Sequence, residues 1–453
     1  MRFARVAVLA VMGLSSIGAP KAAELYFDFN ENHTGGGANA SVFLFGSAGQ
    51  NATVSNLAGF NQMVTLGVDG FFNLPISNIY QQSGTGIVNT GFSVTSASAI
   101  AGYFVNRQQA TTDMSYLLDS SALGNNYLVA SQGSPSSSGF GEGSQVAIHA
   151  TQNGTNVTFT PTGGAPVAVT LNAGETYKYA GGTTNLTGSQ VAADKPVAVF
   201  GGSSCAQVPV GATYCDTLLE QMIPTERLSK TYALAASQGA NISSSGTDLV
   251  RVIASADATD VKVNGVVVAT LNKGQFYEFS LSANAGASVE GSNPVMVAQY
   301  LTGGGGANTD PAMSLVPGSD TWLADYRLST PSGAQDFTVD YASVVINTAD
   351  LGTLTLDSSN VDTSSCTPIA GTSYSRCNVT LPNGLFNMHA ANPFLVMLGG
   401  GSGADSYFTY GGATFAPGVS PPVDPPVTTP EPATMALFGV GLLGLAAARR
   451  RRG

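Results

Sequence analysis

Four aspartates recur at intervals of about one hundred residues, each after a short apolar segment: Asp113, Asp216, Asp310 and Asp405. Carboxylate oxygens are the hard ligands that calcium prefers, so one interpretation is a calcium site in each repeat. The other is a structural turn in which the carboxylate accepts backbone N–H bonds. One carboxylate is too few for a calcium site, and no further oxygen ligands recur at fixed offsets, so we favour the structural turn.

Three histidines, His33, His149 and His389, are the candidates for general acid–base catalysis. They are widely separated in the sequence, and no Gly-x-Ser-x-Gly motif stands in the strand-to-helix context of a nucleophile. The glycine-rich segment from Thr302 to Asn308 lacks the Lys-Ser/Thr of a phosphate loop. We therefore expect no enzymatic activity and no cofactor. The alternative is a secreted hydrolase with an unrecognised site, whose activity would be lost on mutating His149.

The N-terminal segment has the pattern of a secretory signal peptide. Arg2 and Arg5 precede the apolar stretch Val6–Ile17, and small residues follow up to Ala23. A basic start, an apolar core and small residues at the end are typical of a segment that is removed on export. We assign residues 1–23 to this signal.

The C-terminal segment combines three parts in a fixed order: Pro430-Glu431-Pro432, the uncharged run Ala433–Ala448, and Arg449–Arg452. As a helix the run would span about 24 Å, slightly less than the bilayer core of about 30 Å. The arginines are expected to stay on the cytoplasmic side of the membrane. A plain membrane anchor is one interpretation of this segment.

The same three parts resemble the PEP-CTERM sorting signal, which would occupy residues 430–453 after a Pro-rich linker at 418–429. The resemblance implies processing by an exosortase, a membrane-embedded enzyme of Gram-negative bacteria that make exopolysaccharide. We therefore expect an exported protein that the C-terminal helix anchors transiently in the inner membrane. Its destination would be the outer surface or the extracellular matrix.

The region between the two signals is strongly acidic. It keeps 27 of the 28 acidic residues but only 10 of the 17 basic ones, for a net charge of −17. Nucleic acid is therefore not expected as a partner, because phosphate binding needs clustered Lys and Arg. An exopolysaccharide or a cell-surface ligand is the partner we expect.

The four cysteines of an exported chain suggest two disulfides. Three pairings are possible, and we favour Cys205–Cys215 with Cys366–Cys377 because each closes a short loop. Zinc is the rival interpretation, but neither pair has Cys-x-x-Cys spacing and no histidine is near. We therefore expect no metal site.

The chain also repeats itself. Pro196, Pro294 and Pro393 begin similar apolar phrases at spacings of 98 and 99 residues, and Ala99 holds the corresponding place in a first copy. Together with recurring tyrosine phrases, this spacing predicts four units: 24–120, 121–225, 226–320 and 321–417.

Each unit has the composition of an all-β domain. Short alternating runs, such as Val167–Leu171 and Val261–Val263, are separated by Asn-Gly, Gly-Gly and Asp turns. About 100 residues with some seven short strands is the size of one β-sandwich. A closed ring of four β-blades is the alternative architecture. Pro196 and Pro294 suit the first residue of a strand in either case.

The segment Asp194–Pro224 resembles the N-terminal domain of IgGFc-binding protein. The resemblance rests on the strand Lys195–Phe200, the loop closed by Cys205 and Cys215, and the Glu220-Gln221 pair that follows. It implies an extracellular, non-enzymatic role that is adhesive or structural. It does not imply antibody binding.

Overall fold

The computed structural model describes residues 23–33, 39–133, 141–242, 245–303, 309–331 and 337–415. The expected signal peptide up to residue 22, the Pro-rich linker and the sorting segment 430–453 lie outside these residues. Within them, the only α-helix is the short α1 (Gln238–Ile242), and the rest is strand, turn or 3-10 helix. The all-β prediction is confirmed. No helix of this described part is long and apolar enough to cross a bilayer.

The first unit is a sandwich of two antiparallel four-stranded sheets, in the orders β1-β7-β3-β4 and β5-β2-β8-β9. The Phe27 ring stacks on Phe92 and Phe104 at centroid distances of 4.6 and 4.8 Å, and all three side chains are buried. The strands are β1 (Ala23–Phe27), β2 (Asn39–Phe45), β3 (Asn51–Asn56), β4 (Asn61–Thr65), β5 (Phe71–Ser77), β7 (Phe92–Ser96), β8 (Ala101–Gln108) and β9 (Thr111–Tyr116).

The third unit repeats this topology, with the orders β17-β22-β19-β20 and β21-β18-β23-β24. Its strands are β17 (Thr231–Ala235), β18 (Thr247–Ala254), β19 (Thr259–Val263), β20 (Val266–Leu271), β21 (Phe276–Ser282), β22 (Gly286–Gly291), β23 (Val295–Leu301) and β24 (Ala312–Leu315). The repeated phrases of the sequence thus correspond to a repeated sandwich-like arrangement of sheets.

The second and fourth units each form one eight-stranded sheet built on a 17-residue strand, which pairs with different strands along its two halves. The strands of the second unit are β10 (Gly124–Leu128), β11 (Ser144–Ala150), β12 (Thr155–Thr160), β13 (Val167–Leu171), β14 (Thr176–Gly182), β15 (Gln190–Ala206) and β16 (Asp216–Gln221). Those of the fourth are β25 (Leu323–Ser329), β26 (Val339–Asn347), β27 (Thr355–Leu356), β28 (Ser359–Asn360), β29 (Thr367–Pro368), β30 (Tyr374–Thr380), β31 (Leu385–Gly401) and β32 (Ser406–Tyr410).

These long strands correct the expected place of one proline, Pro196. Pro294 directly precedes β23, but Pro196 and Pro393 lie inside β15 and β31. In β15 the pairing with β12 ends at Ala193, and the pairing with β11 begins at Val197. Pro196 stands between the two registers, where its missing N–H removes no ladder bond.

Several short elements lie within the units or between them. The strand β6 (Gly86–Val88) follows the chain of the first unit but pairs with β14 of the second. The 3-10 helices are η1 (Asn78–Tyr80), η2 (Ser120–Ala122), η3 (Thr225–Arg227) and η4 (Thr348–Thr353).

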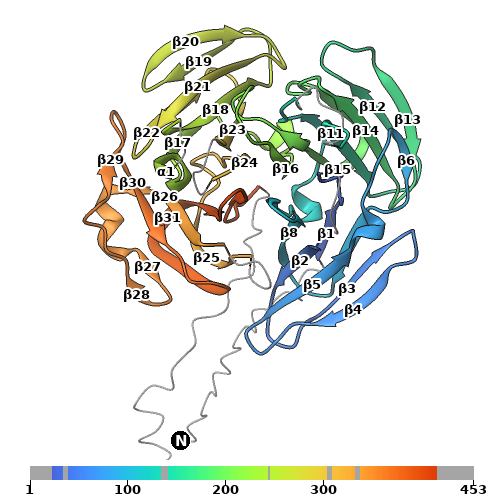
Figure 1. The fold of residues 1–453 in the computed structure, drawn as a ribbon, viewed down its shortest axis with the longest axis horizontal. Helices are drawn as coiled ribbons and strands as arrows, with labels where there is room; N and C mark the ends of the chain where they lie inside the picture. Colours follow the sequence, from blue (N-terminus) through green and yellow to red (C-terminus); the bar gives the residue numbers. More distant parts are fainter. Residues whose placement is uncertain are drawn as a thin grey trace, which may run out of the picture.

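The four units lie in chain order around a common centre (Figure 1). The last strand of each unit, β9, β16, β24 or β32, is the innermost, and each packs against its two neighbours. The first unit contacts the fourth directly, since the Tyr103 hydroxyl donates to the Gly411 carbonyl over 2.6 Å. The units therefore form a closed ring of sandwiches, which combines the two architectures considered from the sequence.

Candidate functional site

The structure contains both local disulfides, Cys205–Cys215 and Cys366–Cys377. The first closes the connection between β15 and β16, next to the central strands. The second anchors β30 to the loop that precedes β29. Each bond thus holds a connection next to a strand in place.

The recurring aspartates come together at the centre of the ring, and all four are buried. The strand registers pair Val105 with Met114, Gly202 with Leu219, Tyr300 with Met313 and Gly399 with Phe408. Three residues before these partners stand Thr111, Asp216, Asp310 and Asp405. Thr111 is therefore the residue of the first unit that is equivalent to Asp216, Asp310 and Asp405. Asp113 lies two residues further along β9 and has no equivalent among them.

Asp113 joins the four units through its two carboxylate oxygens. One oxygen accepts the N–H groups of Met114 and Phe408, at 3.0 and 3.3 Å. The other accepts those of Leu219 and Met313, at 2.9 and 3.0 Å. Burial raises the pKa of Asp113, and the four backbone donors oppose that rise. Because both oxygens are fully used as acceptors, the arrangement fits a carboxylate with no proton of its own.

The other three aspartates, Asp216, Asp310 and Asp405, form a cluster at the centre of the ring. Burial raises the pKa of Asp216, and the charges of Asp310 and Asp405 raise it further. Burial is also the main cause that raises the pKa values of Asp310 and Asp405 to about 7. Each of the three keeps one carboxylate oxygen without a hydrogen-bond partner among the described residues. Uncompensated buried carboxylates favour the protonated form.

These residues differ in part from the turn that we expect from the sequence. Asp216 accepts the N–H of Thr217 at 2.6 Å, as in a turn, but Asp113 lies within a strand and bridges units. No group of three or more His, Cys, Asp or Glu side chains in the described ranges is arranged to hold a metal ion.

A second polar cluster lies at the junction of the first and second units. The buried Asp28 accepts hydrogen bonds from Gln82 at 2.6 Å and from the Thr176 hydroxyl at 2.8 Å. Its other oxygen lies 3.4 Å from Nδ1 of the fully buried His149. Sequence reasoning selected His149 but missed Asp28, which is 121 residues away and belongs to another unit.

His149 also lines a pocket of about 190 Å³ between the two units. Strands β1, β3 and β7 of the first unit provide Glu24, Tyr26, Asn56 and Ser93. The second unit provides His149 and the turn between β13 and β14. The Tyr26 ring lies 5.0 Å from the His149 ring. Burial and the neighbouring Glu24 raise the pKa of Tyr26, so its hydroxyl stays protonated.

The other histidines are not part of this pocket. His389 is half exposed on β31, and its Nδ1 lies 2.6 Å from Asp325. The backbone N–H of His33 donates to the side chain of Asn32 in the first unit. The three histidines therefore do not form one site.

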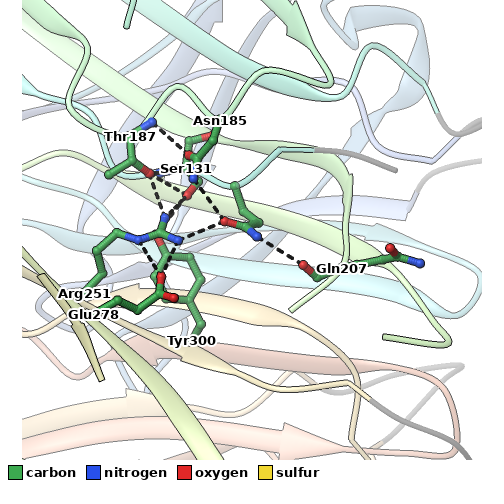
Figure 2. Close-up of polar contacts among 8 residues, drawn as sticks. Ser131, Asn185, Thr187, Gln207, Arg251, Glu278 and Tyr300 are labelled. Atoms are coloured by element: carbon green, nitrogen blue, oxygen red, sulfur yellow. Dashed lines mark hydrogen bonds and ion pairs between the residues drawn. The ribbon is translucent and has the colours of Figure 1, made fainter. Parts of the chain in front are cut away.

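Arg251 on β18 holds the junction of the second and third units (Figure 2). Its Nη1 donates to the Ser131 carbonyl and the Thr187 hydroxyl, at 2.7 and 2.8 Å. Nη2 donates to Gln132 at 3.0 Å, and both Nη2 and Nε donate to Glu278. All five N–H donors of the guanidinium are thus used. A buried guanidinium whose N–H donors all bond to the protein is typical of a structural contact.

Replacing Arg251 with lysine is expected to lower the free energy of unfolding by about 2 kcal/mol. A lysine has three donors and no planar fork, so it cannot serve both units at once. Urea unfolding measures the effect. The matched control is Lys262→Ala, because Lys262 makes an exposed ion pair with Glu290 and should change stability by less than about 0.5 kcal/mol. Equal effects of the two substitutions would contradict this assignment.

Comparison with known proteins gives two matches to protein families. The profile described as IgGFc binding protein matches residues 113–400, from β9 through most of β31. The PEP-CTERM protein-sorting motif matches residues 428–452. This motif indicates an exported protein of a Gram-negative bacterium that is sorted to the cell surface, and it implies processing by an exosortase.

The human IgGFc-binding protein is 28% identical to the chain over 292 residues, which cover 57% of this chain. The chain spans only 5% of the length of that human relative.

Two solved structures show weak similarity to the chain. An α-L-rhamnosidase of Streptomyces avermitilis complexed with L-rhamnose is 10% identical, with a TM-score of 0.16, over 69% of this chain and 44% of the enzyme. A Ca²⁺-stabilised adhesin of an Antarctic bacterium that binds ice is 13% identical, with a TM-score of 0.13, over 87% and 99%. Scores this low support no conclusion about fold or function.

Proposed function

We propose that this chain, which belongs to the IgGFc-binding protein family, is an adhesive or structural protein of the bacterial surface or extracellular matrix. An exosortase cuts its tail, and the ring then binds exopolysaccharide or another cell-surface ligand. The main support for the proposal is that one chain contains both a surface-sorting motif and the domain of this family.

The surface chemistry of the ring supports a ligand of a particular kind. The region between the two terminal signals has a net charge of −17, which repels acidic polymers. Strands such as β12 and β13 alternate buried or partly buried residues with exposed Thr, Asn and Ala. A neutral polysaccharide offers hydroxyl groups to such polar faces without a charge penalty. Four units in one rigid ring also present these faces several times over, which favours avidity.

The binding test uses the mature protein from its host. We expect immobilised neutral exopolysaccharide of that host to retain it, and an acidic polymer such as alginate to retain it less. A strain that lacks the gene should adhere less to the same surface. Equal adhesion of both strains, together with no retention on the polysaccharide, would refute the proposal.

Export and processing can be tested separately by intact-mass analysis. We expect the mature protein to lack the signal peptide and the region after about Pro430, since the sorting motif covers residues 428–452. In a strain without the exosortase, the protein should keep Arg449–Arg452 and remain in the membrane fraction. A secreted mature protein that retains these arginines would contradict processing.

A secreted hydrolase remains the second candidate, and one observation favours it. Asp28 and His149 have the relation of an orienting carboxylate to a general base, and His149 borders a pocket. No nucleophilic hydroxyl of the described chain bonds to His149 Nε2, which weighs against a preformed triad. Release of reducing sugar from the host polysaccharide, lost in a His149 variant, would favour this candidate.

A further inference from the structure

The outermost strand of the third unit, β21, has a free edge. It ends the sheet β21-β18-β23-β24, and because β24 is innermost in the ring, β21 lies at the outer end of the sheet (Figure 1). No described strand pairs with β21 on the side away from β18. Its residues alternate between exposed and partly or fully buried. The backbone N–H and C=O groups on that side are therefore open to a further strand.

The equivalent edge in each of the other three units is covered or blocked. β5, β14 and β30 hold the place of β21 in their sheets. β6 pairs with residues 176–178 of β14, and β29 pairs with Ser375 and Arg376 of β30. β5 is uncovered, but its register with β2 directs the backbone of Pro75 outward, where the missing N–H interrupts an added strand. Among the described strands at this place, only β21 is both open and free of proline.

The repeat shows why β21 stays open. Gly174 and Gly274 stand in matching turns 100 residues apart, so residues 176–178 of β14 correspond to residues 276–278 of β21. The three residues of β14 are buried beside β6, whereas Phe276 and Glu278 are exposed. The connection that carries β6 runs over residues 78–91, but the corresponding connection of the second unit has only residues 183–189. This shorter connection contains no strand, which leaves β21 without a neighbour.

The hydrogen bonds at the two ends of β21 determine which backbone groups point outward. The Ala254 N–H donates to the Gln275 carbonyl at 3.0 Å, and the Ala283 N–H donates to the Gly246 carbonyl at 2.8 Å. Bonded and non-bonded pairs alternate along antiparallel strands, so every second residue between these ends bonds to β18. The residues whose N–H and C=O groups face the free side are therefore Phe276, Glu278, Ser280 and Ser282.

We propose that β21 pairs with β21 of a second copy of this chain, antiparallel about a two-fold axis at Phe279. Phe276 then lies opposite Ser282 of the second copy, so a large side chain meets a small one. Glu278 lies opposite Ser280 of the second copy, so no like charges are paired. All four outward-facing residues of each copy find a backbone partner in this register. Because both copies use the same surface, the pairing closes as a dimer.

The charge of the rim favours a second copy as the occupant. The region between the terminal signals has a net charge of −17, so two copies repel each other over most of their surface. In β20 and β21 the only charged residue is Glu278, which already pairs with Arg251 at 2.7 Å. β20 is the free edge of the other sheet, and a four-residue turn (272–275) places it on the same side as β21. Its exposed Val266 and Val267 extend the apolar surface that a second copy would cover.

Substitutions at Ser280 test the pairing without removing a bond of the ring. Ser280→Pro removes an N–H that points away from β18, and it stands two residues before the end of its strand, as Pro75 does in β5. Ser280→Glu places a like charge opposite Glu278 of the second copy, whereas Ser280→Lys places an opposite charge there. The control is Thr158→Glu, which adds the same charge at an exposed position on β12, a strand with neighbours on both sides.

Sedimentation velocity of the mature protein over a range of concentrations measures the equilibrium between monomer and dimer. We expect the wild type to dimerise and Ser280→Pro to remain a monomer. The two like-charge pairs in the Ser280→Glu dimer should weaken dimerisation about tenfold. Ser280→Lys should dimerise at least as tightly as the wild type, and Thr158→Glu should not differ from it.

A single engineered cysteine checks the register. At a non-bonded antiparallel pair the Cα atoms are about 4.5 Å apart, which lies within the range of a disulfide. Phe279→Cys should therefore give a covalent dimer under oxidising conditions, and all four native cysteines are already paired. Tyr277→Cys should not, because Leu281 of the second copy would lie opposite it.

Circular dichroism and melting temperature establish that each variant is folded. If Ser280→Pro fails to fold, the opposite effects of Ser280→Glu and Ser280→Lys decide the question. A wild type that stays monomeric at every concentration would overturn the inference, because the edge then takes a strand of another protein or none. A dimer that folded Ser280 variants leave unchanged would overturn it as well, because the copies then meet through another surface. The inference goes beyond the proposed function, and neither outcome bears on polysaccharide binding.

Discussion

Replacing Asp113 with alanine is expected to lower the free energy of unfolding by at least about 4 kcal/mol, the largest effect of any single substitution considered. The carboxylate accepts backbone N–H groups from all four units, three of them across unit boundaries. Each buried N–H left without an acceptor costs about 1–3 kcal/mol. The loss should therefore shift the midpoint of urea unfolding well below that of the wild type.

Asparagine at this position should be almost as harmful, although it has the same shape. Both oxygens of Asp113 accept two N–H groups each, so an amide NH₂ would face two donors whichever way it is turned. The matched control is Asp119→Ala, because Asp119 only caps the first turn of η2 through Ser121 and should cost about 1 kcal/mol. An Asp113→Asn protein as stable as the wild type would show that the carboxylate does not hold the units together.

The second large effect concerns pH. Burial raises the pKa values of Asp310 and Asp405 from 3.8 to about 7, so the folded protein binds their protons more tightly than the unfolded chain. The contribution of these two protonated groups to the stability of the folded protein is therefore fully present below about pH 4. It is lost as the pH rises through about 7. At pH 7.5 the unpaired carboxylates should cost roughly 3 kcal/mol or more, since one pKa unit corresponds to about 1.4 kcal/mol.

The double variant Asp310→Asn/Asp405→Asn should weaken this dependence, leaving the part that comes from the burial of Asp216. We expect it to be more stable than the wild type at pH 7.5 and similar to it at pH 4.5, measured by thermal melting across that range. Asp362→Asn is the control, because Asp362 is exposed and its pKa is lowered by bonds to Ser364. A double variant that keeps the wild-type pH slope would contradict the assignment. Repeating the melts with calcium tests the ligand alternative, since a bound cation would stabilise the wild type at neutral pH.

Sequence reasoning reached the class of fold because that information is local. Alternating residues and turn signals predict strands, and the repeated phrases indicate copies of one arrangement. The local disulfides follow from loop length in the same way. The sequence could not indicate that Pro196 lies inside a strand that changes partner strands, because this depends on which strands pair with it on each side.

The candidate sites were harder to predict because they form between units. Asp113 resembles the other three aspartates in spacing, and only the strand registers show that Thr111 is their counterpart. Asp28 and His149 belong to different units, and the sequence of one chain does not say how its repeats face each other. In both cases the sequence contains the residues, but it does not show which residues of the other units they contact.

The contact between the first and fourth units determines when the protein can finish folding. An exported chain crosses the membrane from its N-terminus, so β9 arrives outside long before its partners in β32. The Tyr116 N–H cannot donate to the Thr409 hydroxyl until that residue, 293 positions later, has crossed. Asp113 likewise cannot accept the Phe408 N–H before then. Contacts this distant in sequence form slowly and leave polar edges open in the meantime. The core is therefore completed only when the last strand has crossed, just ahead of the sorting motif at residues 428–452.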